Sequence, residues 1–177
     1  ASQYNKYGYG AYGIVVSADG DASIDNSGEI TVDSAGSANG AVALSFAGDA
    51  SVTNAGDISV TTDAILYYGA NGIVAFAANG SAYAGNSGNI DVTSKYISSG
   101  IDVSGLDGAT ASNSGDISVD AWRAYGIRAQ AGNGDAHVSN EGSIYATYSL
   151  GGGSAFGILG ISGNGDRFVG GPDAKNY

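Results

Sequence analysis

Acidic side chains recur at two fixed positions of a repeating sequence pattern, and repeated carboxylates could bind a metal ion. The first position holds Asp21, Asp49, Ser81, Gly108 and Asp135, and the second holds Glu29, Asp57, Asn89, Asp116 and Ser143. Because Ca²⁺ prefers several oxygen ligands, the candidate calcium ligands are Asp21, Asp49, Glu29, Asp57 and Asp116. Stacked acids repel one another unless a cation or water screens them. The same acids could therefore form a hydrated face that keeps a β-rich surface from pairing with its neighbours.

Paired carboxylates also cleave glycosidic bonds, and some β-helical enzymes act on polysaccharides in this way. Such enzymes gather acids, Arg and Lys in a long groove built from loop insertions. Here the variable corners are short, and Arg123 and Arg128 are the only neighbouring cations. The single histidine, His137, alternates with apolar residues and is expected to face solvent, and the chain has no cysteine. A zinc site or a Ser-His-Asp triad therefore has little to build on, and a polysaccharide-active enzyme is our third functional hypothesis.

Aromatic residues gather in the most variable part of the repeating pattern. This part lies at the corner before a Gly-Ile pair that opens most copies of the repeat. The candidate binding residues at this edge are Tyr67, Tyr68, Tyr96, Trp122, Tyr125 and Tyr148. Exposed aromatic rings with few charges suit binding to sugars or to protein partners. Alternatively, the rings stack on one another and simply close the corner. We expect Tyr96, Trp122 and either Tyr125 or Tyr148 to come within reach of one another from consecutive repeats.

These side chains are positioned by a pattern, Asn-x-Gly-x-Ile, that occurs five times. Its asparagines are Asn26, Asn54, Asn86, Asn113 and Asn140, which lie 28, 32, 27 and 27 residues apart. A period of this length predicts a solenoid. Alternating apolar residues on both sides of each Asn predict two strands, and the Asn-x-Gly corner between them is expected to need a left-handed backbone.

A third strand opens most copies of the repeat with a Gly-Ile pair. These pairs begin at Gly13, Gly72, Gly100, Gly126 and Gly157, whereas the second copy offers Gly40-Ala41. Three short strands and three corners per repeat predict an all-β fold, a right-handed parallel β-helix of about five to six coils. The competing fold is an antiparallel β-sandwich, which does not require the same Ala, Asn, Gly and Ile in every unit.

The whole chain, residues 1–177, is expected to form a single solenoid. Residues 1–9 are the expected N-terminal cap or lead-in, and residues 163–177 are the expected C-terminal tail or cap, where Arg167 breaks the alanine column and Pro172 should stop strand pairing. Solenoid ends expose unpaired strands, which caps normally cover. Neither end reads as an amphipathic helix, so we expect a fragment of a longer solenoid or a subunit that stacks end to end.

The composition is acidic and free of sulfur. The formal net charge is −11, and the chain contains neither cysteine nor methionine. These features fit an extracellular protein that backbone hydrogen bonds stabilise in place of disulfides. Because the six basic residues are scattered, nucleic acid is not an expected partner. There is no long apolar run, so we do not expect the chain itself to span a membrane.

Two stretches carry a family resemblance. They begin Ala11-Tyr-Gly-Ile-Val-Val and Ala124-Tyr-Gly-Ile-Arg-Ala, and each continues through Gly-Asp-Ala to Asn-x-Gly-x-Ile. This combination, over about residues 11–165, resembles the repeats of bacterial autotransporter passenger domains. The resemblance implies a right-handed β-helix that is secreted through an outer-membrane barrel and displayed on a Gram-negative cell, commonly as an adhesin. The sequence contains neither that barrel nor a match to an enzymatic passenger module.

Two non-enzymatic hypotheses lead. The first is a bacterial cell-surface or secreted stalk or adhesin segment, with a host or surface glycan or protein as partner. The alternative is a structural subunit that stacks on copies of itself into an extracellular fibre. Apart from the calcium candidate, no cofactor is expected.

Overall fold

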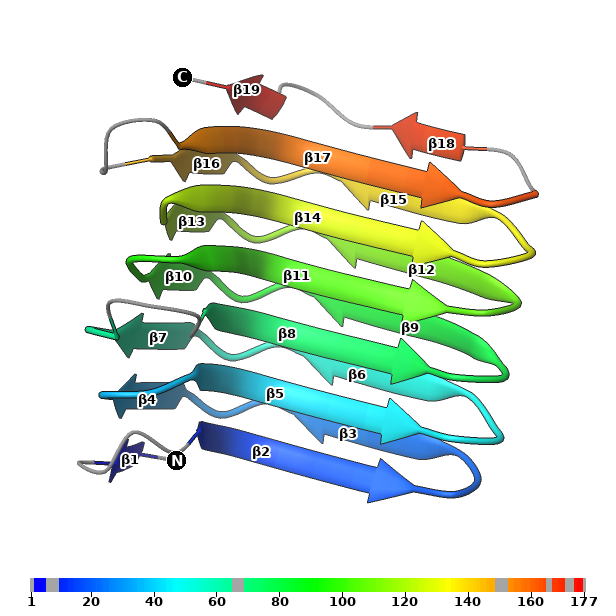
Figure 1. Cartoon of the computed structure of the whole chain (residues 1–177), viewed down its shortest axis with the longest axis horizontal. Coiled ribbons are helices and arrows are strands. Elements are labelled where there is room, and N and C mark those ends of the chain that lie inside the picture. Colours follow the sequence, from blue (N-terminus) through cyan, green and yellow to red (C-terminus); the bar gives the residue numbers. More distant parts are fainter. Residues whose placement is uncertain are drawn as a thin grey trace.

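Every secondary-structure element that the structure describes is a β-strand, and the strands form a solenoid of stacked coils (Figure 1). The computed structural model describes residues 10–64, 69–148 and 153–164, together with the backbone of β1 (Ser2–Asn5), β18 (Arg167–Gly170) and β19 (Ala174–Asn176). Three parallel sheets run along the solenoid, and each coil contributes one strand to each sheet. The predicted all-β solenoid with three strands per coil is thus confirmed.

We name the three sheets by their strands. The long-strand sheet contains β2 (Ala11–Ala18), β5 (Ala38–Ser45), β8 (Ala70–Ala77), β11 (Ile97–Gly105), β14 (Arg123–Ala131) and β17 (Ser154–Ser162). The asparagine sheet contains β3 (Ala22–Asn26), β6 (Ala50–Asn54), β9 (Ser81–Asn86), β12 (Gly108–Asn113), β15 (Ala136–Asn140) and β18. The isoleucine sheet contains β1, β4 (Ile30–Ser34), β7 (Ile58–Thr62), β10 (Ile90–Thr93), β13 (Ile117–Asp120), β16 (Ile144–Thr147) and β19.

The pairing register stacks equivalent residues of successive repeats. The isoleucine after each corner forms one continuous column: Ile30, Ile58, Ile90, Ile117 and Ile144. All five are buried, as is the column of alanines at the start of the asparagine sheet, Ala22, Ala50, Ala82, Ala109 and Ala136. The deviating second repeat keeps the register, because Ala41 pairs with Ile14 on one side and Ile73 on the other. The core is therefore a narrow stack of Ala, Ile and Val.

The corner asparagines form a buried hydrogen-bonded ladder. In each coil from Asn26 to Asn113, the side-chain amide nitrogen donates to the Oδ1 of the next asparagine at 2.7 or 2.8 Å. The same nitrogen also donates to the carbonyl oxygen of the glycine two residues on. Except for Asn26, these side chains are buried. Each buried amide therefore finds partners for both of its N–H groups, which avoids the cost of burying unsatisfied polar groups.

The corner glycines are required for a different reason from the one predicted. None of Gly28, Gly56, Gly88, Gly115 and Gly142 has a left-handed φ, so that prediction was wrong. Instead, a Cβ atom added to any of the last four would lie 2.0 or 2.1 Å from the carbonyl oxygen of the corner glycine one coil earlier. Close stacking of backbone on backbone is what excludes a side chain here.

A second glycine column lies on the long strands. It consists of the glycines of the Gly-Ile pairs and of Gly40, which precedes Ala41 in the second repeat. A Cβ added to Gly13, Gly40, Gly72, Gly100 or Gly126 would come within 2.2–2.6 Å of the Cγ2 methyl of the corner isoleucine in the same coil. The long strand therefore crosses the isoleucine column with no room for a side chain. Glycine at this position lets a bulky isoleucine fill the narrow core.

The strand-pairing pattern continues toward both ends. β1 pairs with β4, while β18 and β19 pair with β15 and β16. Arg167 stands opposite Ala136, so it interrupts the alanine column as predicted. Pro172 lies outside the described residues, and strand pairing is present again at β19. The strands described within the two expected caps, β1, β18 and β19, thus extend the sheets.

The corner glycines supply a matched pair of substitutions. We expect Gly88→Ala to destabilise the fold by about 1–3 kcal/mol, because its Cβ would overlap the Gly56 carbonyl oxygen. Gly28→Ala should be neutral or slightly stabilising, because the nearest atom, Asn26 Oδ1, would lie 3.9 Å from the added carbon. Thermal unfolding followed by circular dichroism measures both. Equal effects at the two positions would contradict the proposed backbone contact.

Candidate functional site

The carboxylates of the first acidic column bind the backbone of the next coil. Asp21 Oδ1 accepts a hydrogen bond from the backbone N–H of Asp49 at 2.9 Å. Asp49 Oδ1 in turn accepts from the N–H of Ser81 at 2.8 Å. These side chains follow the turn that leaves the long strand, where the backbone needs acceptors outside the regular ladder. They connect successive coils.

The second acidic column does the same at the Asn-x-Gly corner. Asp57 Oδ1 accepts from the N–H of Asn89 at 2.8 Å, and Asp116 Oδ1 accepts from the N–H of Ser143 at 2.9 Å. Between them, the amide oxygen of Asn89 accepts from Asp116 N–H at 3.2 Å. An uncharged side chain therefore serves in the same place as the carboxylates. What this position requires is an acceptor oxygen.

The calcium interpretation gains no support from these contacts. Glu29, the remaining candidate, is exposed, and its Oε1 accepts a hydrogen bond from the Thr31 hydroxyl at 3.3 Å. Across the residues that the structure describes, no three Asp, Glu or His side chains gather as a group that could hold a metal ion. His137 is half-buried on β15, between the buried Ala136 and Val138. The other four candidate ligands, Asp21, Asp49, Asp57 and Asp116, are separate links between coils.

Two of the predicted aromatic residues come together at the corner between the isoleucine and long-strand sheets. The rings of Tyr96 and Trp122 stack at 6.1 Å between centroids with an interplanar angle of 11°. Both side chains are half-buried. The guanidinium carbon of Arg123 lies 5.4 Å from the centroid of the Trp122 ring, a cation–π distance. The predicted approach of Tyr96 and Trp122 is confirmed.

Tyr125 belongs to a separate stack on the outer face of the long-strand sheet. Its ring lies 5.3 Å from the ring of Phe156, which occupies the same register position one coil later. Tyr125 is only 8% exposed, so its ring mainly packs against neighbours. Phe156 lay outside the predicted set, although it precedes a Gly-Ile pair just as Tyr125 does.

A charged pair lies beside this second stack. Arg128 Nε donates to Asp102 Oδ1 at 2.9 Å, and Arg128 Nη2 donates to Asp102 Oδ2. Arg128 also lies over the Tyr125 ring, with 5.4 Å between guanidinium carbon and ring centroid. The hydrogen bond to Asp102 raises the pKa of the Arg128 guanidinium above its ordinary value, against the opposing effect of burial. This arginine is therefore a fixed cation that its neighbours already bind.

The remaining predicted aromatic residues differ in position. Tyr148 follows β16 and is 47% exposed. Tyr67 and Tyr68 lie outside the described residues. The corner with a stacked and partly exposed pair of rings, Tyr96 and Trp122, is the best-defined part of the predicted binding edge, and we call this pair the aromatic corner.

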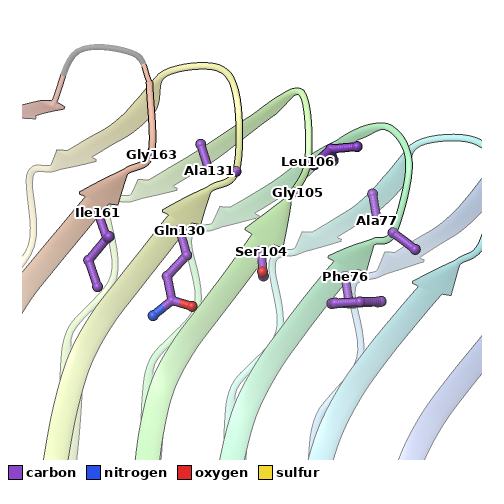
Figure 2. Close-up of a pocket in the computed structure, with 11 residues that line it drawn as sticks. Phe76, Ala77, Ser104, Gly105, Leu106, Gln130, Ala131, Ile161 and Gly163 are labelled. Carbon is purple, nitrogen blue, oxygen red and sulfur yellow. The ribbon is translucent and has the colours of Figure 1, made fainter.

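The surface of the described residues also includes hollows that the sequence did not predict, of which two are well formed. One, of about 380 Å³, opens at the ends of the long strands and is lined by Phe76, Ser104, Leu106, Gln130 and Ile161, among others (Figure 2). The other, of about 290 Å³, lies on the isoleucine sheet beside Asp91, Asp116, Ser118 and Tyr145. In the first hollow, Ser104 stacks between Phe76 and Gln130, and in the second, Ser118 stacks between Asp91 and Tyr145. Each hollow therefore contains a small serine with larger side chains one coil away, an arrangement that depends on the pairing register.

Comparison with known proteins adds no relative. No family model matches the chain, and neither the curated proteins nor the solved structures contain a significant match. The described residues also contain no helix with the length and apolar character needed to cross a membrane. The likeness to autotransporter passengers therefore depends on the sequence motifs alone.

Asp57 provides a test that separates the two roles of the acidic columns. Asp57→Asn keeps an acceptor oxygen, so the melting temperature should hardly change, whereas Asp57→Ala should lose about 1 kcal/mol or less with the hydrogen bond to Asn89. We expect added CaCl₂ or EDTA to leave all three melting temperatures unchanged. Stabilisation of the parent protein by calcium that Asp57→Asn abolishes would restore the calcium interpretation.

Proposed function

We propose that this chain is a non-enzymatic segment of a bacterial cell-surface or secreted solenoid, a stalk that also presents a binding surface. The supporting observation is how the repeated residues are used. The asparagine ladder, the corner glycines and the acidic columns all join one coil to the next. A chain whose repeated residues serve to stack one coil on the next is suited to forming a rigid rod.

The residues that could do chemistry also support this proposal. Asp21, Asp49, Asp57 and Asp116 each accept a backbone N–H from the following coil. Arg128 is held by Asp102. A general acid or nucleophile must reach a substrate with its reacting atom, and these side chains already have structural partners. A polysaccharide-active enzyme is therefore the weakest of our three hypotheses.

The aromatic corner is the surface that we assign to binding. Tyr96 and Trp122 offer large, rigid rings that lose little conformational entropy on binding, and Arg123 adds N–H donors beside them. Sugars present apolar C–H faces to rings and hydroxyl oxygens to such donors. This combination suits a glycan, or a protein surface of similar chemistry, as the partner.

Trp122→Ala tests the assignment, with Tyr83→Ala as the matched control. Tyr83 is 40% exposed on the asparagine sheet, away from the aromatic corner. Trp122→Ala should weaken binding to a glycan panel or to cultured cells about tenfold or more, which corresponds to 1.4 kcal/mol or more. Its stability loss should stay below the roughly 3–5 kcal/mol of a fully buried ring, because Trp122 is only half-buried. Tyr83→Ala should bind normally.

Two results would contradict the binding role of the aromatic corner. One is a folded Trp122→Ala protein that binds as tightly as the parent. The other is a parent protein that binds neither the glycan panel nor the cultured cells. In that case only the stalk role of the proposal would remain.

The open strand edges favour the second candidate, a subunit that stacks end to end. β1, β2 and β3 lie at one end of their sheets, and β17, β18 and β19 lie at the other. Among the described strands, each of these six has a neighbour on one edge only, and open edges are templates for pairing with another chain. A second copy of the chain could extend all three sheets at once.

Negative-stain electron microscopy distinguishes these candidates. A stalk segment should appear as short rods of roughly 25–30 Å, the length of five to six coils at the strand spacing. A fibre subunit should give filaments that are one coil wide and lengthen with protein concentration. We expect short rods, and concentration-dependent filaments would move the fibre to first place.

A further inference from the structure

The long-strand sheet carries little of the charge of this acidic chain. Its six strands contain one of the 17 acidic residues, Asp102, and two of the six basic residues, Arg123 and Arg128. Their net charge is therefore +1, against −11 for the whole chain. Because Asp102 and Arg128 bind each other, the outer face has almost no free charge.

The same face gathers exposed apolar side chains. Among the described residues, eight large hydrophobic side chains are strongly exposed, and five of them are on or directly beside this sheet: Tyr12, Val15, Phe46, Phe76 and Phe156. Of these five, Phe46, just after β5, is the most exposed at 52%. Apolar side chains concentrated on one neutral face mark an interaction surface.

The face is also large enough for a stable interface. Six strands at about 4.8 Å spacing and eight or nine residues at about 3.3 Å each span roughly 29 by 28 Å. The resulting area is roughly 800 Å², which is what each partner contributes to a standard protein–protein interface.

A protruding ring and a hollow lie at the same end of the long strands. Phe46 directly follows β5, and Leu106 takes the corresponding place after β11, two coils later. Leu106 borders the hollow of about 380 Å³, with Phe76 and Ile161 at its sides and Ser104 and Gln130 between them (Figure 2). A hollow of this size has room for a phenyl ring.

We propose that two copies of this chain pair face to face through the long-strand sheet, with their coils running in opposite directions. A two-fold axis parallel to the long strands reverses the order of the coils but keeps each residue's position along the strands. Phe46, in the second coil, then faces the partner's hollow in the later coils, and the partner's Phe46 faces the first copy's hollow. The surface is therefore self-complementary, as a two-fold interface requires.

Charge favours a second copy as the occupant of this face. Two chains of net charge −11 repel each other, and any approach through the acidic corners would bring like charges together. The long-strand sheet is the face on which two copies meet with least repulsion, because its one acidic side chain, Asp102, is already bound to Arg128. This dimer does not depend on the proposed stalk or binding role, because Phe46 and the aromatic corner lie at opposite ends of the long strands.

Sedimentation velocity over a range of protein concentrations tests the interface. The parent chain should form a dimer, and raising the NaCl concentration should maintain or tighten it, because salt screens the repulsion between the copies. Phe46→Asp should raise the dimer dissociation constant about tenfold or more, and Val15→Asp should also raise it. The control, Tyr83→Asp, changes an exposed ring on another sheet and should leave the dimer intact. Because all three side chains are exposed, the monomer fold should persist, as circular dichroism can verify.

Disulfide trapping tests the direction of the pairing. The chain has no cysteine, so single substitutions give a clean background. On oxidation, a mixture of Phe46→Cys and Gln130→Cys proteins should form the mixed dimer in preference to either symmetric one, because reversing the six coils places Phe46 of the second coil opposite the partner's fifth coil, where Gln130 lines the hollow.

Three results would overturn the proposal. They are a parent chain that stays monomeric at every concentration, a dimer that Phe46→Asp and Val15→Asp leave unchanged, and preferential cross-linking of Phe46→Cys to itself. End-to-end stacking would instead give species that grow beyond two copies, and a ligand or a different protein on this face would leave the purified chain monomeric.

Discussion

The contact between successive Asn-x-Gly corners is the constraint on which the rest of the structure depends. At the corners from Asn54 to Asn113, a buried asparagine amide donates to the asparagine of the next coil, while the glycine two residues on lies against the carbonyl oxygen of the previous corner glycine. The amide needs that close approach to reach its partner, and the approach needs a residue without Cβ. Neither residue type could change alone without leaving a buried polar group unsatisfied or forcing the coils apart.

With the corner fixed, the other columns follow. The isoleucine two residues after the glycine must point inward, and the glycine of the long strand must leave room for its methyl group. The loops absorb the differences in repeat length, since the second interval is longer and yet Ile58 still pairs with Ile90. The inward column from Ile24 to Val138 varies only among small and branched apolar residues, whereas outward positions and corners carry the aromatic rings and the neutral face.

Periodicity was enough to predict the columns but not what their members contact. Ile90 could be placed in a buried stack from the sequence because register depends only on counting residues from each corner. The acceptor role of Asp57 could not be predicted from the sequence, because it depends on the distance from its carboxylate to a backbone N–H in the following coil. The reason why position 88 requires glycine was also predicted wrongly, since local backbone preference does not reveal a carbonyl oxygen one coil away. Trp122 was correctly placed near Tyr96, but the stacking of Tyr125 on Phe156 was not predicted, although both residues directly precede a Gly-Ile pair.

The asparagine ladder also gives the solenoid a direction. Backbone hydrogen bonds between coils run both ways along the axis, as Ala55 N–H to Asn26 O and Ile58 N–H to Asn89 O show. The side-chain amides from Asn26 to Asn113 instead all donate toward the C-terminal coils. Aligned amides polarise one another, so their dipoles add along the rod and do not cancel. The interior of the solenoid is thus electrically polar along its length, although no ionised group lies within the ladder.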